Sequence, residues 1–216
     1  MNTLYVDSDW ESPWVLSVYV ALREKGVEFA ERTMNLAAGE QRAAEYAEKT
    51  LTARVPAIDV EGFVLSESLA IIEYLEERYP PPEYPAVLPV TLEQRARARQ
   101  IMGWVRSDLT ALRRERPTTT VFYTPTDVPL SAAAQADAEK LVRVASQLLE
   151  QGRPTLFDRW SVADVDLAIA LMRLEANGHP LPAALSAYAR AQWERASVRS
   201  FVAHSATSRR VDATVP

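Results

Sequence analysis

The stretch that decides the fold reads V-P-A-I-D-V-E-G-F-V-L-S-E-S-L-A-I-I-E-Y-L and covers residues 55–75. Two short apolar runs, at 55–60 and 63–65, flank Glu61-Gly62, a dipeptide typical of a hairpin turn. Residues 66–79 then carry apolar side chains at helical spacing, namely Leu69, Ile72 and Leu75. The stretch therefore predicts a β-hairpin that runs directly into a helix.

Toward the N-terminus the same alternation continues. Residues 4–6 and 28–34 have the composition of strands, and residues 40–49 that of a helix. Residues 13–25 have a helical apolar face, and Gly26 follows as the expected C-terminal stop. The order β-α-β-α-β-β-α predicts a small sheet covered by helices.

A proline-rich segment separates two regions of different character. Five of the 14 prolines lie between Pro80 and Pro89, and such a run favours an extended connector over a helix. We predict one domain at 1–80, a linker at 81–90 and an all-helical domain at 91–216.

The region after the linker shows helical patterns only. Thr91-x-x-Gln94 is a capping box that opens a long helix, and Ser161-x-x-Asp164 opens another. Two apolar seams step 4-3-4-3 and predict an antiparallel helix pair: Ala98, Met102, Val105, Leu109, Leu112, and Ala134, Ala138, Leu141, Ala145, Leu148. Shorter helices are expected at 184–194 and 197–205, and a Pro-rich loop at 116–129.

Composition excludes several function classes. The chain has 216 residues, with 48% hydrophobic and 25% charged, and a formal net charge of −5, which disfavours nucleic-acid binding. Cysteine is absent and only His179 and His204 are present, so we expect no metal site, no disulfide and no cysteine nucleophile. No apolar stretch is long enough to span a membrane, and a cytoplasmic protein is expected.

Three short motifs each allow a structural and a functional interpretation. Ser12-Pro13 suits a helix N-cap, and its hydroxyl could also face a bound anion. Pro56 could be an ordinary strand-start proline or a cis proline that leaves the preceding backbone free for a peptide ligand. Glu67 and Ser68 could cap a helix, or hold the ammonium and carboxylate groups of an amino acid.

Arginines recur at near-helical spacing on the long helix that begins at Thr91: Arg95, Arg99, Arg106 and Arg113. A solvated face paired with nearby acids is the usual explanation of such a row. The denser Arg113-Arg114-Glu115-Arg116 could also receive an anionic ligand. His179 lies in a turn and is expected at the surface.

Taken together, these motifs resemble the cytosolic glutathione S-transferase family over essentially the whole chain. The resemblance rests on Ser12-Pro13, Val55-Pro56, the Glu67-Ser68-x-Ala70-Ile71 motif, the linker and the Ser161-x-x-Asp164 box. Among these enzymes the chain looks most like the bacterial YfcF-type serine transferases, through S-P-W-V-L-S (12–17), E-Q-R-A-R-A-R-Q-I (93–101), R-S-D-L (106–109), E-R-P-T (115–118) and Q-W-E-R-A-S-V (192–198).

The resemblance implies a thioredoxin-like α/β N-terminal domain, an all-α C-terminal domain and a homodimer. It implies that Ser12 faces the glutathione sulfur and that the backbone of Val55, before a cis Pro56, pairs with the cysteinyl part. Glu67 and Ser68 would bind the γ-glutamyl end, with Arg54 nearby. The Ser161 and Asp164 box would be structural. Many relatives carry Asn-Pro where this chain has Thr50-Leu51.

The chemistry implied is conjugation of the glutathione thiolate to a hydrophobic electrophile, or glutathione-dependent reduction of a peroxide, as in detoxification. Glutathione would be the co-substrate, with no metal. A second-substrate pocket is expected between the domains, where we predict Trp10, Trp14, Trp104 and Arg113. The alternative is a catalytically inactive binding protein on the same fold.

Overall fold

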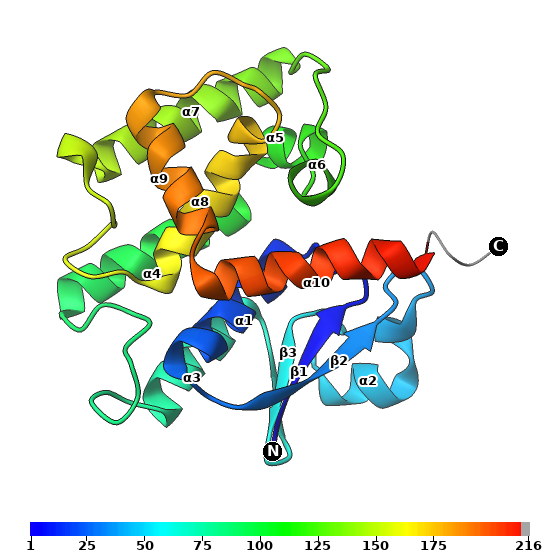
Figure 1. Cartoon of the computed structure of the whole chain (residues 1–216). Coiled ribbons are helices and arrows are strands. Elements are labelled where there is room, and N and C mark those ends of the chain that lie inside the picture. The colour runs from blue at the N-terminus through cyan, green and yellow to red at the C-terminus, as the bar shows by residue number, and fades with distance from the viewer. Residues whose placement is uncertain (213–216) are drawn as a thin grey trace. The chain divides into compact units, whose positions relative to one another are not determined.

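The structure, a computed structural model, describes the backbone of residues 1–212 and the side chains of residues 1–150 and 152–205. The chain divides into two compact units (Figure 1). Unit 1 comprises residues 1–87 together with the chain from Ser200 onward, and unit 2 comprises Leu88–Arg199. Residues 213–216, which the sequence-based boundaries included in the second domain, lie outside the described residues.

Unit 1 is built on a four-stranded sheet with order β2-β1-β3-β4. Strands β1 and β2 are parallel, whereas β3 is antiparallel to both β1 and β4. The chain order confirms the predicted β-α-β-α-β-β-α arrangement: β1 (Asn2–Asp7), α1 (Pro13–Lys25), β2 (Phe29–Met34), η1 (Glu40–Arg42), α2 (Ala44–Lys49), β3 (Ala57–Val60), β4 (Phe63–Ser66) and α3 (Ser68–Arg78).

Helices cover both faces of this sheet. In Figure 1, α1 and α3 lie on one side of the strands and α2 on the other, and α1 packs against α3. Alternation along β1 explains the two layers, because successive strand residues point to opposite faces. Tyr5 packs in a cluster on the α2 side with Met34, Tyr46 and Ala57, while Leu4 is completely buried.

The proline-rich segment is tied to unit 1 by a buried ion pair. Lys25 lies 2.7 Å from Glu76, and both side chains are almost fully buried. The Lys25 ammonium also donates to the carbonyls of Tyr79 and Pro85, and the Val87 N–H donates to Glu76. These bonds compensate the cost of burying two charges. They also explain why unit 1 extends to Val87 and not to residue 80.

The C-terminal helix α10 (Ala196–Asp212) contributes to unit 1 from Ser200 onward. Phe201 is fully buried and makes edge-on ring contacts with Trp10 and Tyr19. The Tyr19 hydroxyl lies 2.8 Å from the Ser200 hydroxyl. The unit boundary therefore differs from the sequence-based division, which assigned the whole of 91–216 to the second domain, because these aromatic contacts join distant parts of the chain.

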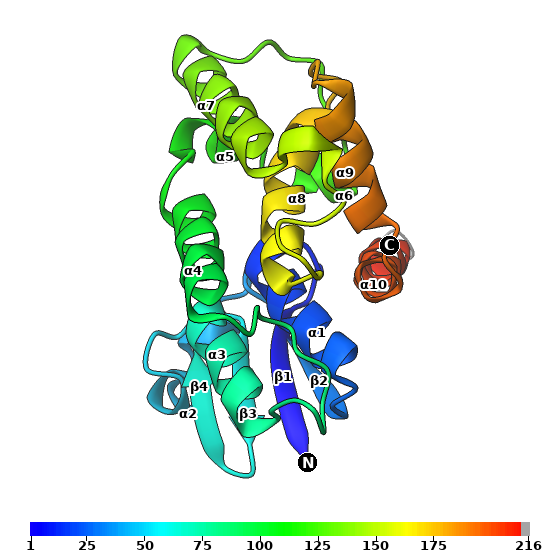
Figure 2. The same ribbon diagram turned by 90° about the vertical axis from the view of Figure 1, so that its left-hand side faces the viewer.

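Unit 2 is helical throughout, as the sequence predicts. Its elements are α4 (Leu92–Ser107), α5 (Thr110–Glu115), α6 (Thr119–Phe122), α7 (Ala132–Leu148), η2 (Glu150–Gly152), α8 (Val162–Glu175), α9 (Ala183–Trp193) and the first turn of α10. Figure 2 shows the helices of this unit and the sheet of unit 1 from a second direction. Within the described residues no helix is long and apolar enough to cross a membrane.

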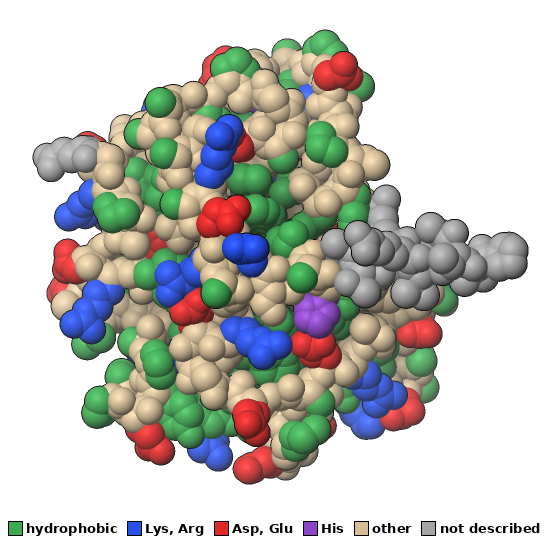
Figure 3. Space-filling model, in the orientation of Figure 1, with side chains coloured by type: hydrophobic (Ala, Val, Ile, Leu, Met, Phe, Trp, Pro, Cys, Tyr) green, Lys and Arg blue, Asp and Glu red, His purple; other side chains and the backbone are tan. Residues whose placement is uncertain are grey.

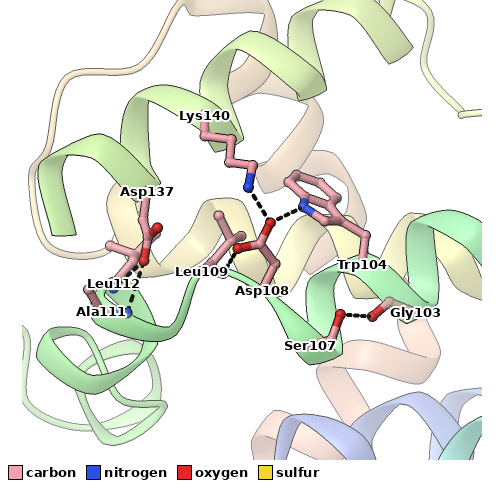
Figure 4. Close-up of polar contacts among 9 residues, drawn as sticks. All are labelled: Gly103, Trp104, Ser107, Asp108, Leu109, Ala111, Leu112, Asp137 and Lys140. Atoms are coloured by element: carbon pink, nitrogen blue, oxygen red, sulfur yellow. Dashed lines mark hydrogen bonds and ion pairs between the residues drawn. The ribbon is translucent and has the colours of Figure 1, made fainter. Parts of the chain in front are cut away.

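The predicted long helix over Thr91–Leu112 is wrong, because the helix breaks between α4 and α5. Leu109 has φ +57°, and the Asp108 carboxylate accepts the Leu109 N–H at 2.8 Å (Figure 4). The same carboxylate accepts the Trp104 indole N–H and the Lys140 ammonium. A carboxylate that satisfies a helix end in this way favours a stop over another turn.

The break changes the packing that the two apolar seams predict. Helix α7 packs against α5, whereas α4 packs against α8. Asp137 on α7 accepts the backbone N–H groups of Ala111 and Leu112 at the start of α5 (Figure 4). The antiparallel pair therefore forms only over the short α5 segment and not over the full predicted length.

Candidate functional site

Ser12 lies in the loop between β1 and α1 and caps the helix. Its Oγ accepts the Val15 N–H at 3.4 Å, and Pro13 is the first helical residue. The residue as a whole is half-buried. A hydroxyl that accepts a cap bond still has its own proton to donate.

Asp7, at the end of β1, anchors this loop through hydrogen bonds to its backbone. Its carboxylate accepts the Glu11 N–H at 2.7 Å and the Ser12 N–H at 3.2 Å. Only 3% of Asp7 is exposed, and this burial raises the pKa of its carboxyl against the lowering effect of the backbone donors. Asp7 is not among the site residues predicted from the sequence, although an acid at the end of a buried strand is a usable signal.

The Val55-Pro56 peptide bond is cis, which decides between the two alternatives left open by the sequence. Pro56 is buried, and Val55 packs against the Tyr5 cluster. The pairings of β3 with β1 and with β4 begin at Ala57, so the backbone of Val55 lies outside both ladders. Its amide groups are therefore available for a chain laid alongside.

The neighbouring Arg54 is anchored through its backbone. The Tyr46 hydroxyl donates to the Arg54 carbonyl at 2.8 Å, and burial raises the pKa of that phenol. The Arg54 side chain is exposed. The bond fixes the backbone in front of Val55 and leaves the guanidinium in solvent.

Glu67 does not cap α3 with its side chain, contrary to the simple capping interpretation. It occupies the N-cap position with φ +71°, and its carboxylate accepts no cap hydrogen bond. The residue is exposed, whereas Ser68, the first helical residue, is 5% exposed. A non-glycine residue in the left-handed region costs free energy and is found preferentially at functional sites.

The sheet register places these three segments at one edge of unit 1. Tyr5 pairs with Ala57, and Ala57 pairs with Ser66. The end of β1, the start of β3 and the end of β4 therefore meet at the same edge. The Ser12 loop follows the end of β1, Val55-Pro56 precedes the start of β3, and Glu67-Ser68 follows the end of β4. One edge thus presents a hydroxyl, two helix N-termini, a free backbone segment and a carboxylate.

The residues predicted for a second substrate are placed differently. Trp10 is 5% exposed and stacks on His204, so it belongs to the core of unit 1. Trp14 is half-buried on α1. In unit 2, Trp104 donates to Asp108, and Arg113 donates to the Arg106 carbonyl.

Two of the arginines expected on a solvated face are partly buried. Arg106 pairs with Asp166, whose side chain is fully buried on α8. Burial, together with the nearby charge of Arg106, lowers the pKa of Arg113. This ion pair fastens α4 to α8, which helical spacing on α4 alone does not reveal.

Ser161 and Asp164 form a capping box at the start of α8. The Asp164 carboxylate accepts the Ser161 N–H at 2.9 Å, the Leu156 N–H at 2.7 Å and the Tyr188 hydroxyl at 2.9 Å. Burial of Asp164 raises the pKa of its carboxyl, and the same surroundings raise that of the Tyr188 hydroxyl. The box therefore joins α8, α9 and the preceding loop within unit 2.

A four-stranded mixed sheet with a cis-proline edge, followed by a helical region, is the architecture of the glutathione transferases. Residues 3–77 match the family model of the glutathione S-transferase N-terminal domain, and residues 91–207 match that of the C-terminal domain. The chain belongs to the glutathione S-transferase family.

Individual relatives agree with this assignment. A glutathione transferase homolog from Burkholderia GL BGR1, crystallised with bound glutathione, is 41% identical with a TM-score of 0.80, covering 95% of this chain and 98% of that one. Maleylacetoacetate isomerase of Dictyostelium discoideum is 34% identical over 51% of this chain and 50% of its own length. Mouse glutathione S-transferase theta-3 is 34% identical over 41% of this chain and 36% of its own length. The matches thus span half or less of the length of these two curated relatives.

Proposed function

We propose that this protein is a glutathione transferase that conjugates the glutathione thiolate to a hydrophobic electrophile, with Ser12 as the stabilising hydroxyl. The observation that carries the proposal is the meeting of the Ser12 loop, Val55-Pro56 and Glu67-Ser68 at one sheet edge. The bound glutathione in the Burkholderia homolog, 41% identical over nearly the whole chain, supports the same ligand here.

Each group at the edge suits one part of the tripeptide. The exposed Glu67 carboxylate matches the γ-glutamyl ammonium, and the N-terminus of α3 with Ser68 matches the α-carboxylate. The Val55 backbone matches the cysteinyl amide groups, as one strand recognises another. The sulfur then comes to lie near Ser12 at the start of α1.

Ser12 and the helix terminus supply the activation. A free thiol has a pKa of about 8.5, so only about 3% is thiolate at pH 7. Lowering that pKa by about two units requires about 2.7 kcal/mol of differential stabilisation. A hydrogen bond from the Ser12 hydroxyl together with the positive end of α1 is sufficient for this. The thiol proton leaves to solvent, and the sulfur displaces a leaving group from the electrophile.

Two finer assignments rest on narrower support. Within the family we place the chain with the bacterial YfcF-type serine enzymes, on the Ser12-Pro13 motif and its surrounding sequence. Reduction of an organic hydroperoxide would use the same thiolate: it attacks the terminal peroxide oxygen and releases the alcohol, and a second glutathione then converts the resulting sulfenic acid to glutathione disulfide and water.

A second candidate reaction is isomerisation, and the observation that supports it is the 34% identity to a maleylacetoacetate isomerase. In that reaction the thiolate would add to a carbon–carbon double bond, the new single bond would rotate, and the thiolate would leave again. No glutathione would be consumed. The inactive binding protein is the remaining alternative, and it predicts no turnover with any of these substrates.

The substitution Ser12→Ala tests the proposal. We expect turnover to fall at least tenfold while glutathione affinity, followed through tryptophan fluorescence and calorimetry, stays within about twofold. The substitution also removes an N-cap, which costs about 1 kcal/mol of stability. Thr91→Ala is the matched control, because it removes a cap bond of the same 3.4 Å length on α4.

The assay panel separates the candidate reactions. Wild-type protein is tested with chloronitroaromatic electrophiles, an organic hydroperoxide and maleylacetoacetate, and glutathione consumption is measured in each case. Unchanged turnover in Ser12→Ala would refute the role of Ser12. Isomerisation without glutathione consumption would replace transfer by the isomerase function, and no turnover would favour the binding protein.

We also propose a homodimer, as is usual in this family. Leu51 is 95% exposed and Phe63 is 52% exposed, both in unit 1. Leu51 lies in the loop before β3 and Phe63 is the first residue of β4, and exposed apolar patches are a mark of protein interaction sites.

A further inference from the structure

Three side chains of α10 contact Trp10, which lies two residues before Ser12. The His204 ring stacks on the Trp10 indole at 4.1 Å between centroids and 12° between planes. Phe201 meets the same indole edge-on at 5.3 Å. The Ser205 hydroxyl, 1% exposed, donates to the Trp10 carbonyl. Both the side chain and the backbone of Trp10 are thus held by the C-terminal helix.

The Ser12 loop is fixed at its other side by the end of β1. The Trp10 N–H donates to the Asp7 carbonyl at 3.1 Å, and the Asp7 carboxylate accepts the next two backbone N–H groups. Trp10 itself has φ +53°, a conformation that a bulky residue adopts only when its surroundings impose it. The loop is therefore held between Asp7 and α10.

The docking of α10 is fixed by further polar contacts inside unit 1. Tyr19 bonds the Ser200 hydroxyl at 2.8 Å, and the His204 Nε2 lies 3.5 Å from the Tyr19 hydroxyl. Glu31 on β2 lies 3.8 Å from the same nitrogen. These contacts fix the position of α10 along its axis and its rotation about that axis, and so determine which of its residues contact Trp10.

From this arrangement we infer that residues 200–205 of α10 position Ser12 for thiolate stabilisation, with His204 and Ser205 acting through Trp10. The inference rests on the proposed function and adds to it a set of positioning residues distant from Ser12 in the sequence. A hydrogen bond to a thiolate depends steeply on direction and length, so a small displacement of Trp10 changes the stabilisation that Ser12 provides.

The test compares His204→Ala with His204→Phe, which keeps a ring on Trp10 but removes the imidazole. The readouts are the pKa of the bound glutathione thiol, from thiolate ultraviolet absorbance against pH, together with kcat and glutathione affinity. We expect His204→Ala to raise the thiol pKa by about one unit and so to lower kcat about threefold at pH 7, through the smaller thiolate fraction. Affinity should change less than twofold, and His204→Phe should restore most of the loss.

Two further comparisons keep the result specific. His179→Ala, at the other histidine of the chain, is the matched control and should resemble wild type. In a Ser12→Ala background, His204→Ala should have no further effect on the thiol pKa, because both changes remove the same interaction. Ser205→Ala removes the hydrogen bond to the Trp10 carbonyl and keeps the ring contacts, and should give a smaller shift of the same sign if His204→Ala does not fold.

The outcomes separate this inference from the function it rests on. Suppose that wild type binds glutathione and is active, but that His204→Ala and Ser205→Ala both keep the wild-type thiol pKa and kcat. The positioning role then fails and the proposed function stands. Additive effects in the Ser12→Ala background also overturn it. If wild type binds no glutathione, the proposed function fails and the inference fails with it.

Discussion

Glu67 combines a costly backbone conformation with an exposed carboxylate. A residue with φ +71° whose exposed side chain makes no cap hydrogen bond gains no local side-chain stabilisation from that conformation. The conformation is explained if the carboxylate is held out for a ligand ammonium group. The sequence alone allows both capping and ligand binding, because Ser and Glu at a helix start suit either purpose.

Glu67→Gln should therefore weaken glutathione binding about tenfold, since an amide of the same shape cannot pair with an ammonium as a carboxylate does. Calorimetric titration measures the change. Glu61→Gln is the matched control, because Glu61 is also exposed and also has a positive φ, in the hairpin turn. Equal affinities for the two variants would remove Glu67 from the site.

At this scale the sequence predicts candidate residues better than it predicts their supports. Ser12 and Val55-Pro56 stand in recognisable local motifs. Asp7 contacts the backbone of a loop that has no regular spacing, and His204 contacts Trp10, which is remote in the sequence. The roles inferred for both residues depend on these buried contacts. Such roles depend on tertiary structure and leave only weak traces in local spacing.

At the scale of elements, the start of α8 depends on the side chain of Asp164. Asp164→Ala leaves the Leu156 N–H, the Ser161 N–H and the Tyr188 hydroxyl without their common acceptor in a buried place. We expect a loss of about 3 kcal/mol in the free energy of unfolding, from the cost of unsatisfied buried donors. Urea denaturation measures it.

Asp158→Ala is the control for that experiment. Asp158 is exposed and bonds only the Gln94 side chain among the contacts described for it, so a change below about 0.5 kcal/mol is expected. A loss for Asp164→Ala as small as this would show that the box does not hold α8.

The junction of α4 and α5 gives a pH dependence with a definite sign. The hydrogen bond from Lys140 lowers the pKa of Asp108 below its ordinary value of 3.8, with help from the Leu109 N–H. A lowered folded-state pKa means that the stabilisation is complete above pH 3.8 and is lost as the pH falls through the folded-state value.

Asp108→Asn should therefore be less stable than wild type at neutral pH, and the difference should shrink at acid pH. Urea denaturation at a series of pH values measures both. The difference in stability between wild type and Lys140→Met should show much of the same pH dependence, because this substitution removes the first cause of the lowered Asp108 pKa. A difference that stays constant down to acid pH would contradict this account.

The element boundaries also show where a periodic pattern misleads. Leu109 and Leu112 continue the 4-3-4-3 stepping of α4, so the pattern predicts one uninterrupted helix. The interruption comes from a side chain that satisfies a helix end, and hydrophobic periodicity carries no information about this. Helix α1, by contrast, has both a cap and a stop signal, and its bounds agree with the prediction.

For the whole molecule, the charge pattern agrees with a small-molecule site. The net charge is −5, and on the face seen in Figure 3 acidic and basic side chains are interspersed. A protein that binds nucleic acid through its backbone needs a gathered basic surface. The two-part layout of the chain was also predictable, because strand patterns stop at the proline-rich segment.

The proposed dimer is tested at Leu51, which has φ +45°. Its neighbours are fixed, because the Thr50 hydroxyl donates to the Tyr46 carbonyl and the Thr52 hydroxyl to the Ser66 hydroxyl. We expect light scattering to give wild type twice its chain mass of 24.1 kDa. Leu51→Lys should shift the population toward the single chain, because it places a charge in an apolar contact.

Leu36→Lys, at another exposed leucine of unit 1, is the control and should leave the mass unchanged. A wild-type mass of one chain would refute the dimer. A dimer that tolerates Leu51→Lys would place the interface elsewhere.

The return of α10 to unit 1 has a consequence for the order of events at the ribosome. Residues 1–87 are synthesised more than a hundred residues before Phe201 and His204. Trp10 and Tyr19 then have no Phe201 or His204 to cover them, and the loop before Ser12 lacks its second support. The nascent N-terminal unit therefore completes its core only after residues 200–205 have been synthesised, and the inferred positioning of Ser12 waits for them.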